Sequence, residues 1–331
     1  MAGRRAPRLR PIREAAFHAW LGSTLGGRPE GAPLPFGDDV AAFGRGRSRL
    51  LATTDGFSEG THFTAESPPR AIGRALVAAN LSDLASKGGT PIGFLLALLL
   101  PPATEARWAR EVVRGVRSAL APHGIELSGG DTKPAGTRSL LGVALGTAGP
   151  GPLPGRHRAR PGDLLAVTGT VGRGGLAAWR LAHRPGSRPA RLRALLDLRA
   201  RVAEGRLLAP RVHAMVDSSD GLFASARLLA AASRVAVRLR EEAIPIDPGL
   251  LAAVPDPADR LRVAAYGGDY ELVAALPPRE ERAARAALAR IGSPFTVVGR
   301  VTAGRGAWIE GRGRPRRLPP AGWDPFRPRA P

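Results

Sequence analysis

Short clusters of aspartate, flanked by glycine, serine or threonine, constrain this chain more than any other feature. They occur in a strongly basic chain, which has 28 Asp and Glu against 49 Lys and Arg and a net charge of +21. Carboxylates gathered on tight loops repel one another unless cations compensate them. Oxygen ligands of this kind suit Mg²⁺, which in turn suits a phosphate substrate, so the pattern predicts a metal-dependent enzyme that acts on phosphates. The clustered residues are Asp38, Asp39, Asp55, Asp83, Asp131, Asp217 and Asp220.

Composition excludes several other classes of protein. The chain has no cysteine, so disulfides, thiolate metal sites and cysteine nucleophiles are excluded, and its six histidines lack the spacing of a zinc site. The arginines are spread along the whole chain instead of forming one stripe with aromatic residues, so no specific nucleic-acid partner is expected.

No segment predicts membrane insertion or secretion. The most apolar run, Ile92 to Leu100, is about half the length that a membrane span needs, and the basic N-terminus lacks the apolar part of a secretory signal. We therefore expect a cytoplasmic protein without a membrane partner.

A segment rich in proline, glycine and arginine, residues 149–163, divides the chain. With 331 residues the chain is long enough for two domains. Residues 1–30 are expected to form a basic arm and an N-terminal helix, 31–149 an N-terminal α/β domain, and 150–331 a C-terminal α/β domain. Strands and helices alternate in both halves, which predicts an α/β fold of mixed α+β character.

The apolar pattern places several aspartates at the ends of these elements. A strand over residues 48–54 leads to Asp55, and a helix that opens at Pro68 ends at about residue 86, just after Asp83. A carboxylate in the last turn of a helix opposes the helix dipole, which is unfavourable without a cation. The other helices of interest are expected over residues 104–121, with Thr104 as the N-cap, and over residues 190–204.

Two clusters have alternative explanations. Gly130 and the glycine before it would let backbone N–H groups approach a phosphate, and Lys133 could reach the same anion beside Asp131. The segment DSSDGL opens a helix, so an N-cap would explain either Asp217 or Asp220 without any functional role.

The motifs, taken in order, resemble those of a known family. The segments GDDVAAF, TTDGFSEGTHF, NLSDLASKGG, SGGDT, VTGTVG, DSSDGL and GGDYEL extend over most of the chain. This set is similar to the thiamine-monophosphate kinase family, within the aminoimidazole ribonucleotide synthetase-like superfamily. The resemblance implies a two-domain architecture in which residues 31–149 form the domain that binds metal and ATP and residues 150–331 the domain that completes the active site. It implies further that the N-terminal domains pair in a homodimer. It also implies ATP-dependent phosphorylation of thiamine phosphate to thiamine diphosphate, assisted by several Mg²⁺ ions.

The resemblance also assigns roles to residues, position by position. The metal-binding positions are Asp39, Thr53, Thr54, Asp55, Asp83, Asp131, Asp217 and Asp220. The ATP-binding positions are Gly130, Asp131, Arg156 and Ser219, and the substrate-binding positions are His62 and Trp323. Asp83, Asp131 and Asp220 are the expected catalytic residues.

The chain departs from the family pattern at several positions, and the departure at Gly268 leaves the acceptor open. Gly268 stands where the family has an acid that contacts the thiamine pyrimidine, and Lys87 stands where an apolar residue is usual. One alternative is another ATP-dependent small-molecule phosphotransferase or synthetase of the superfamily. The other is a non-catalytic homologue that binds a nucleotide or a nucleic acid.

Overall fold

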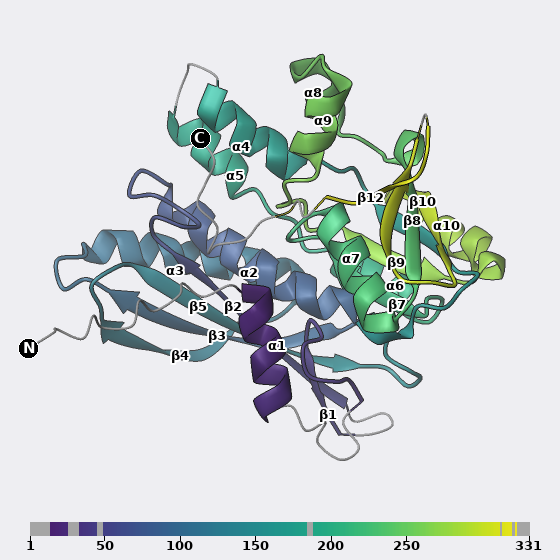
Figure 1. Cartoon of the computed structure of the whole chain (residues 1–331). Coiled ribbons are helices and arrows are strands. Elements are labelled where there is room, and N and C mark those ends of the chain that lie inside the picture. The colour runs from purple at the N-terminus through teal and green to yellow at the C-terminus, as the bar shows by residue number, and fades with distance from the viewer. Residues whose placement is uncertain are drawn as a thin grey trace, which may run out of the picture.

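Two mixed β-sheets with packed helices form the framework of the molecule (Figure 1). The computed structural model describes residues 14–25, 33–44, 49–183, 188–311, 313–319 and 322. In the first sheet the strand order is β1-β2-β5-β3-β4, and only the β3–β4 pair is parallel. Its strands are β1 (Ala41–Phe43), β2 (Arg49–Ser58), β3 (Thr90–Leu100), β4 (Leu127–Pro134) and β5 (Ser139–Ala148).

The second sheet is built from the later part of the chain. Its strand order is β12-β11-β8-β10-β6-β9-β7, with β8 and β11 as the parallel pair. Its strands are β6 (Leu164–Thr168), β7 (Ala214–Asp217), β8 (Ala236–Arg240), β9 (Leu272–Leu276), β10 (Phe295–Thr302), β11 (Gly306–Glu310) and β12 (Arg316–Arg317).

Helices pack on both sheets. The α-helices are α1 (Glu14–Leu25), α2 (Pro69–Ser86), α3 (Ala106–Leu120), α4 (Arg173–His183), α5 (Arg188–Leu195), α6 (Val202–Leu208), α7 (Leu222–Ser233), α8 (Pro248–Ala253), α9 (Pro257–Ala264) and α10 (Glu281–Ala289). Short 3₁₀ turns are η1 (Ala121–His123), η2 (Arg156–Arg158), η3 (Glu241–Ala243) and η4 (Pro278–Glu280). None of the helices in the described ranges combines the length and apolarity that a membrane span requires.

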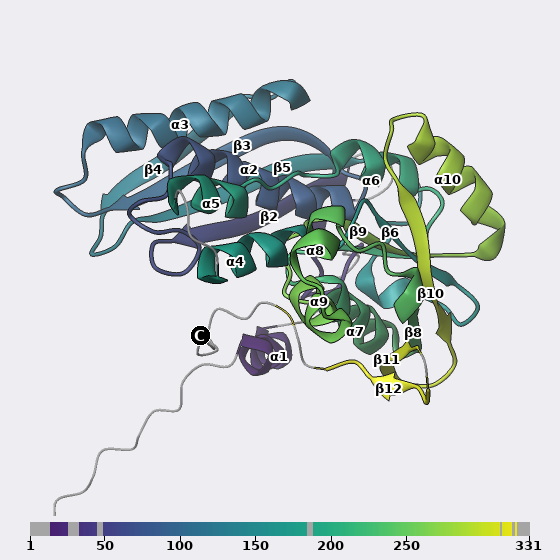
Figure 2. The ribbon, with the colours of Figure 1, turned by 90° about the horizontal axis from the view of Figure 1, so that it is seen from above.

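Helix α2 is the central element of the fold. It packs on the first sheet and on α3 and also contacts α6 (Figure 2) and β7 of the second half. Fourteen of its eighteen residues are buried, so α2 is apolar or small on nearly every face. Glycines bring α2 and α3 close together, since a Cβ at Gly115 would lie 2.1 Å from the carbonyl oxygen of Arg70. The last turn of α2 therefore lies at the junction of the two halves.

One hydrophobic core crosses that junction. Leu51, Leu76 and Phe94 of the first half belong to the same buried cluster as Met215 and Leu272 of the second half. A second buried cluster lies wholly within residues 159–318. Burial of apolar surface between the halves holds the ends of α2 and β7 in contact.

Three local expectations are wrong. The strand predicted to end at residue 54 continues to Ser58, so Asp55 lies within β2 and not after it. The N-cap of α3 is Glu105, without a side-chain hydrogen bond, and not Thr104. The helix expected over residues 190–204 is broken between α5 and α6, where the Arg201 guanidinium turns toward Glu204 and Glu271 and forms buried ion pairs with both.

Candidate active site

A cleft of about 1080 Å³ lies between the two halves. Carboxylates from both halves line it, among them Asp39, Asp55 and Asp83 from the first half and Asp220 from the second. A concave site between domains that gathers several titratable groups is the usual place for ligand binding.

Strand β2 contributes two side chains to the same face because alternate residues of a strand point the same way. The Thr53 hydroxyl lies 2.6 Å from Oδ2 of Asp83, and the backbone N–H of Asp55 donates to Asn80 Oδ1 of α2 (3.0 Å). Burial raises the pKa of the Asp55 carboxyl. Thr54, between them, borders the cleft, but its hydroxyl donates to the carbonyl of Gly142 on β5 (3.0 Å).

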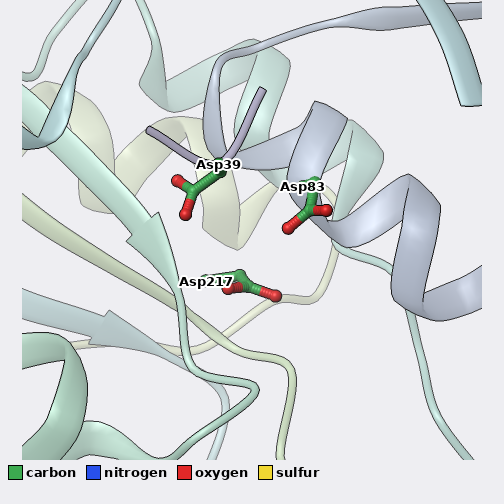
Figure 3. Close-up of side chains that lie close together, drawn as sticks. All are labelled: Asp39, Asp83 and Asp217. Atoms are coloured by element: carbon green, nitrogen blue, oxygen red, sulfur yellow. The ribbon is translucent and has the colours of Figure 1, made fainter. Parts of the chain in front are cut away.

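Three aspartates from separate segments converge at the base of the cleft (Figure 3). Asp39 precedes β1, Asp83 lies in the last turn of α2, and Asp217 ends β7. One carboxylate oxygen of each lies within 4.8 Å of the others. Burial, followed by repulsion from Asp217 and Asp39, raises the pKa of Asp83 well above its usual range. Burial and the charge of Asp39 likewise raise the pKa of Asp217 to about 7.

These carboxyl groups fit a divalent cation. Their convergent oxygens are the ligands that Mg²⁺ takes, and a cation there would offset the burial and the mutual repulsion that raise the pKa values of Asp83 and Asp217.

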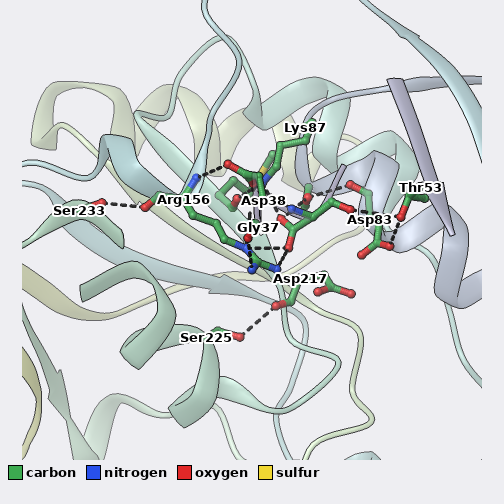
Figure 4. Close-up of polar contacts among 12 residues, drawn as sticks. Gly37, Asp38, Thr53, Asp83, Lys87, Arg156, Asp217, Ser225 and Ser233 are labelled. Atoms are coloured by element: carbon green, nitrogen blue, oxygen red, sulfur yellow. Dashed lines mark hydrogen bonds and ion pairs between the residues drawn. The ribbon is translucent and has the colours of Figure 1, made fainter. Parts of the chain in front are cut away.

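Two cations of the chain itself, Lys87 and Arg156, form ion pairs with Asp39. Figure 4 shows the same two side chains beside the neighbouring Asp38. Arg156, in η2, donates from Nε to Asp39 Oδ1 (3.0 Å) and also contacts this oxygen through Nη2, while its backbone N–H donates to Asp38 Oδ2 (3.0 Å). Lys87, at the C-cap of α2, contacts both carboxylates from the other side. Burial alone would raise the pKa of Asp39, but the charges of Lys87 and Arg156 hold it at about 2.

The turn between β7 and α7 carries Ser219 and Asp220, which both line the cleft. The Ser219 hydroxyl donates to Asp217 Oδ1 (3.2 Å), and the Ser219 carbonyl accepts from the N–H of Gly268 (2.7 Å). The N-cap of α7 is Gly221, without a side-chain capping bond. Helix capping therefore does not account for either aspartate.

Gly130 and Asp131 are not brought to this cleft in the described part of the chain. Both lie on β4, an edge strand of the first sheet whose eight residues are all exposed, and not on a loop as the sequence suggested. The Asp131 carboxylate pairs with Lys133 Nζ at 3.1 Å. Gly130 has a structural reason for being glycine, since a Cβ there would lie 1.8 Å from the carbonyl oxygen of Leu96 on β3.

Of the two predicted substrate-binding residues, His62 lies in the described part of the chain. His62 lines the cleft, stacks on Phe57 with ring centroids 5.2 Å apart, and accepts the backbone N–H of Ser58 at Nδ1 (3.1 Å). These contacts fix the plane of its ring. Trp323 lies outside the described residues.

Sequence reasoning did not assign roles to Asp269 and Tyr270. The Asp269 carboxylate accepts the backbone N–H groups of Gly172 (2.8 Å) and Gly174 (2.9 Å), which fixes the loop before α4, and burial raises its pKa to about 6. Tyr270 lines the cleft with φ of +53°, a conformation uncommon for a bulky residue. Burial, then the charges of nearby aspartates, raises the pKa of its hydroxyl well above the usual value. In the sequence, the two glycines before Asp269 were the signal that could have marked Asp269 and Tyr270 as part of a loop at the site.

Comparison with known proteins identifies the family. The family model for the N-terminal domain of AIR synthase related proteins matches residues 37–149, and the model for the C-terminal domain matches residues 160–310. A thiamine-monophosphate kinase of Pyrococcus horikoshii is 31% identical over 288 residues, which cover 87% of this chain and 90% of that protein. The chain belongs to the thiamine-monophosphate kinase family.

Solved structures of this family share the fold. The structure of AaThiL in complex with AMPPCP and TMP matches with a TM-score of 0.81 at 26% identity, covering 96% of this chain and 99% of that one. The thiamine-monophosphate kinase of Stenotrophomonas maltophilia K279a matches with a TM-score of 0.73 at 33% identity, covering 84% and 90%. The family and the two-domain α/β architecture expected from the motifs are thus confirmed, and with them an enzyme of the kinase class.

Proposed function

We propose that this chain transfers the γ-phosphoryl group of ATP to thiamine phosphate and produces thiamine diphosphate. The observation that supports it most is the convergence of Asp39, Asp83 and Asp217, from both halves, at the base of an interdomain cleft. A structural neighbour of the same family binds an ATP analogue together with TMP. Transfer between two phosphate groups requires positioning and charge neutralisation and no covalent nucleophile, which agrees with a cleft rich in carboxylates.

The acidic residues of the cleft would hold the metal, and Mg²⁺ would supply neutralisation of the phosphate charges there. We assign this role to the carboxylates of the cleft, supported by the Thr53 hydroxyl beside Asp83. His62, with its ring plane fixed, would contact the acceptor, and Ser219 would contact ATP. The acceptor phosphate is already ionised at neutral pH, so the chain needs no strong general base.

Gly130 and Asp131 take part in this proposal only through a second copy of the chain. Their exposure on the edge strand β4 favours a homodimer of N-terminal domains in which one copy places β4 beside the cleft of the other. Sedimentation velocity at micromolar concentration tests the dimer. A monomer that is fully active would remove Asp131 from the site.

The substrate is tested by ADP release from purified protein with Mg·ATP, with and without thiamine phosphate. We expect ADP release to depend on thiamine phosphate and to yield thiamine diphosphate in equal amount. ATP binding without that dependence would show that the acceptor is another small molecule. Absence of both ATP binding and turnover would favour the non-catalytic alternative.

A substitution at Gly268 tests which acceptor the cleft recognises. It lines the cleft with φ of +79°, and a Cβ there would meet only Gly174 Cα at 3.5 Å, so a side chain has room but its backbone is strained. We expect Gly268→Glu to lower the KM for thiamine phosphate about tenfold relative to Gly268→Gln, because a charge-assisted hydrogen bond to the aminopyrimidine is added. The two variants share the same strain and size, so equal KM values would count against thiamine phosphate as the acceptor.

A further inference from the structure

Lys87 is a buried ammonium group behind the aspartates of the cleft. Its side chain has no exposed surface, and neither has that of its partner Asp38. Nζ lies 2.5 Å from Asp39 Oδ2, 2.9 Å from Asp38 Oδ1 and 2.6 Å from the carbonyl oxygen of Met215. Nζ donates hydrogen bonds to Asp39 and to the Met215 carbonyl and forms an ion pair with Asp38. A buried cation with this set of partners is fully compensated and needs no water.

Lys87 and Arg156 engage both carboxylate oxygens of Asp39. Asp39 Oδ2 accepts from Lys87, and it lies 2.7 Å from the hydroxyl of Ser86, whose single proton can go either to this oxygen or to the carbonyl of Asp83 (2.7 Å). Asp39 Oδ1 accepts from Nε and Nη2 of Arg156. Both oxygens of the Asp39 carboxylate are therefore engaged by cationic groups of the chain, which leaves Asp39 less available to a divalent ion than Asp83 or Asp217. By contrast, the side-chain hydrogen bonds to Asp83 and Asp217 come from neutral hydroxyls, among them those of Thr53 and Ser219.

We propose that the Lys87 ammonium is a resident cation that occupies a divalent-ion position at Asp38 and Asp39, so that Mg²⁺ binds on the Asp83 and Asp217 side of the cluster. The oxygens around Nζ, two from carboxylates and one from a carbonyl, are the ligand set that Mg²⁺ or Mn²⁺ takes in proteins. Lys87 is a positioning residue in this scheme, since it acts on the site through Asp39.

The resident cation also joins the two halves without a metal. Lys87 belongs to the end of α2 and Asp38 to the loop before β1, whereas Met215 belongs to β7 of the second sheet. An ammonium that bridges these three segments fixes the base of the cleft in the metal-free protein. Divalent ions then bind to a preformed site and do not have to assemble it.

The first test is anomalous diffraction from crystals of the full chain soaked in MnCl₂. We expect Mn²⁺ within coordination distance of Asp83 or Asp217, with the Lys87 contacts to Asp38 and Asp39 retained. An Mn²⁺ ion bound to Asp39 with Lys87 displaced would overturn the inference, and this measurement does not depend on any variant folding.

The second test compares the wild type with Lys87→Ala, which removes the ammonium and leaves space for an ion. Mn²⁺ bound per chain is counted by equilibrium dialysis, and thermal unfolding is followed with EDTA and with MnCl₂. We expect the variant to bind one more Mn²⁺ than the wild type, to unfold at lower temperature in EDTA and to regain stability with Mn²⁺. A merely structural lysine would give no metal rescue. The matched control is Arg262→Ala, which removes an exposed cation 2.7 Å from Asp259 and should leave the Mn²⁺ count unchanged.

The outcomes separate this inference from the proposed function on which it rests. An equal Mn²⁺ count in wild type and Lys87→Ala overturns the role of Lys87, whatever the turnover. Absence of Mn²⁺ from the cluster in both proteins overturns this inference and the metal role of the aspartates together. Failure of the thiamine phosphate assay with the expected Mn²⁺ counts overturns the proposed substrate and leaves the resident cation in place.

Discussion

Replacing Asp83 by asparagine is expected to lower kcat about 10³-fold, the loss typical when a group that stabilises transition-state charge is removed. The metal-free protein should keep or gain stability. Asparagine retains the shape of the side chain and can still accept the hydrogen bond from Thr53. It also removes a buried negative charge that faces Asp217 and Asp39, the same repulsion that raises the pKa of Asp83. Relief of that repulsion favours the folded state.

The measurements for Asp83→Asn are kcat for ADP release and thermal unfolding in EDTA at pH 8. Asp197→Asn is the matched control, because that carboxylate is exposed and lies 3.6 Å from Arg173 at the surface. The control should retain both kcat and the unfolding temperature. Normal turnover in Asp83→Asn, or a clear loss of stability without metal, would contradict the assignment of Asp83 to a charge-bearing role in the cleft.

The metal-free protein is expected to lose stability as the pH rises from about 4 to about 7. Burial raises the pKa of Asp217 from 3.8 to about 7, so the folded state holds this proton more tightly than the unfolded chain. The contribution of Asp217 to the free energy of unfolding is therefore complete below its pKa in the unfolded state. It is lost as the pH rises through its pKa in the folded state. A shift of about three pH units corresponds to about 4 kcal/mol of unfolding free energy. Asp269, whose pKa is raised to about 6, acts in the same direction.

The contribution of Asp39 to stability depends on pH in the opposite direction, but it changes only at lower pH. Its pKa is lowered to about 2, so its contribution is lost only as the pH falls below about 4. Urea unfolding at several pH values in EDTA measures the dependence, with Asp217→Asn as the comparison. The asparagine variant should show a much weaker loss between pH 4 and 7, and saturating Mg²⁺ should weaken the loss in the wild type. Stability that rises with pH across this range would contradict the raised pKa of Asp217.

The sequence predicted the elements that carry local signals. The diproline before α2 and the two glycines after it gave the bounds of that helix, and the apolar run of β3 gave a buried strand. These signals act through neighbouring residues, through the fixed φ of proline and the freedom of glycine, so they are visible without the fold. The ordered motifs also predicted the family, which the comparisons confirm.

Tertiary structure alone decided which aspartates meet. Asp39, Asp83 and Asp217 are separated by many residues, and their convergence depends on the packing of α2 against β7 across the common core. By the same reasoning Asp131, which the motifs grouped with them, lies on an exposed sheet edge because β4 pairs with β3 alone.

The buried position of Lys87 had no local signal either, because a lysine after a helix is usually a solvated end. By itself the sequence determined most helices and strands, since proline, glycine and apolar periodicity act within a few residues along the chain. It also determined which carboxylates are present. Long-range packing decided which charges face one another, and therefore which of them require a cation and which already have one, because such contacts join residues far apart in sequence.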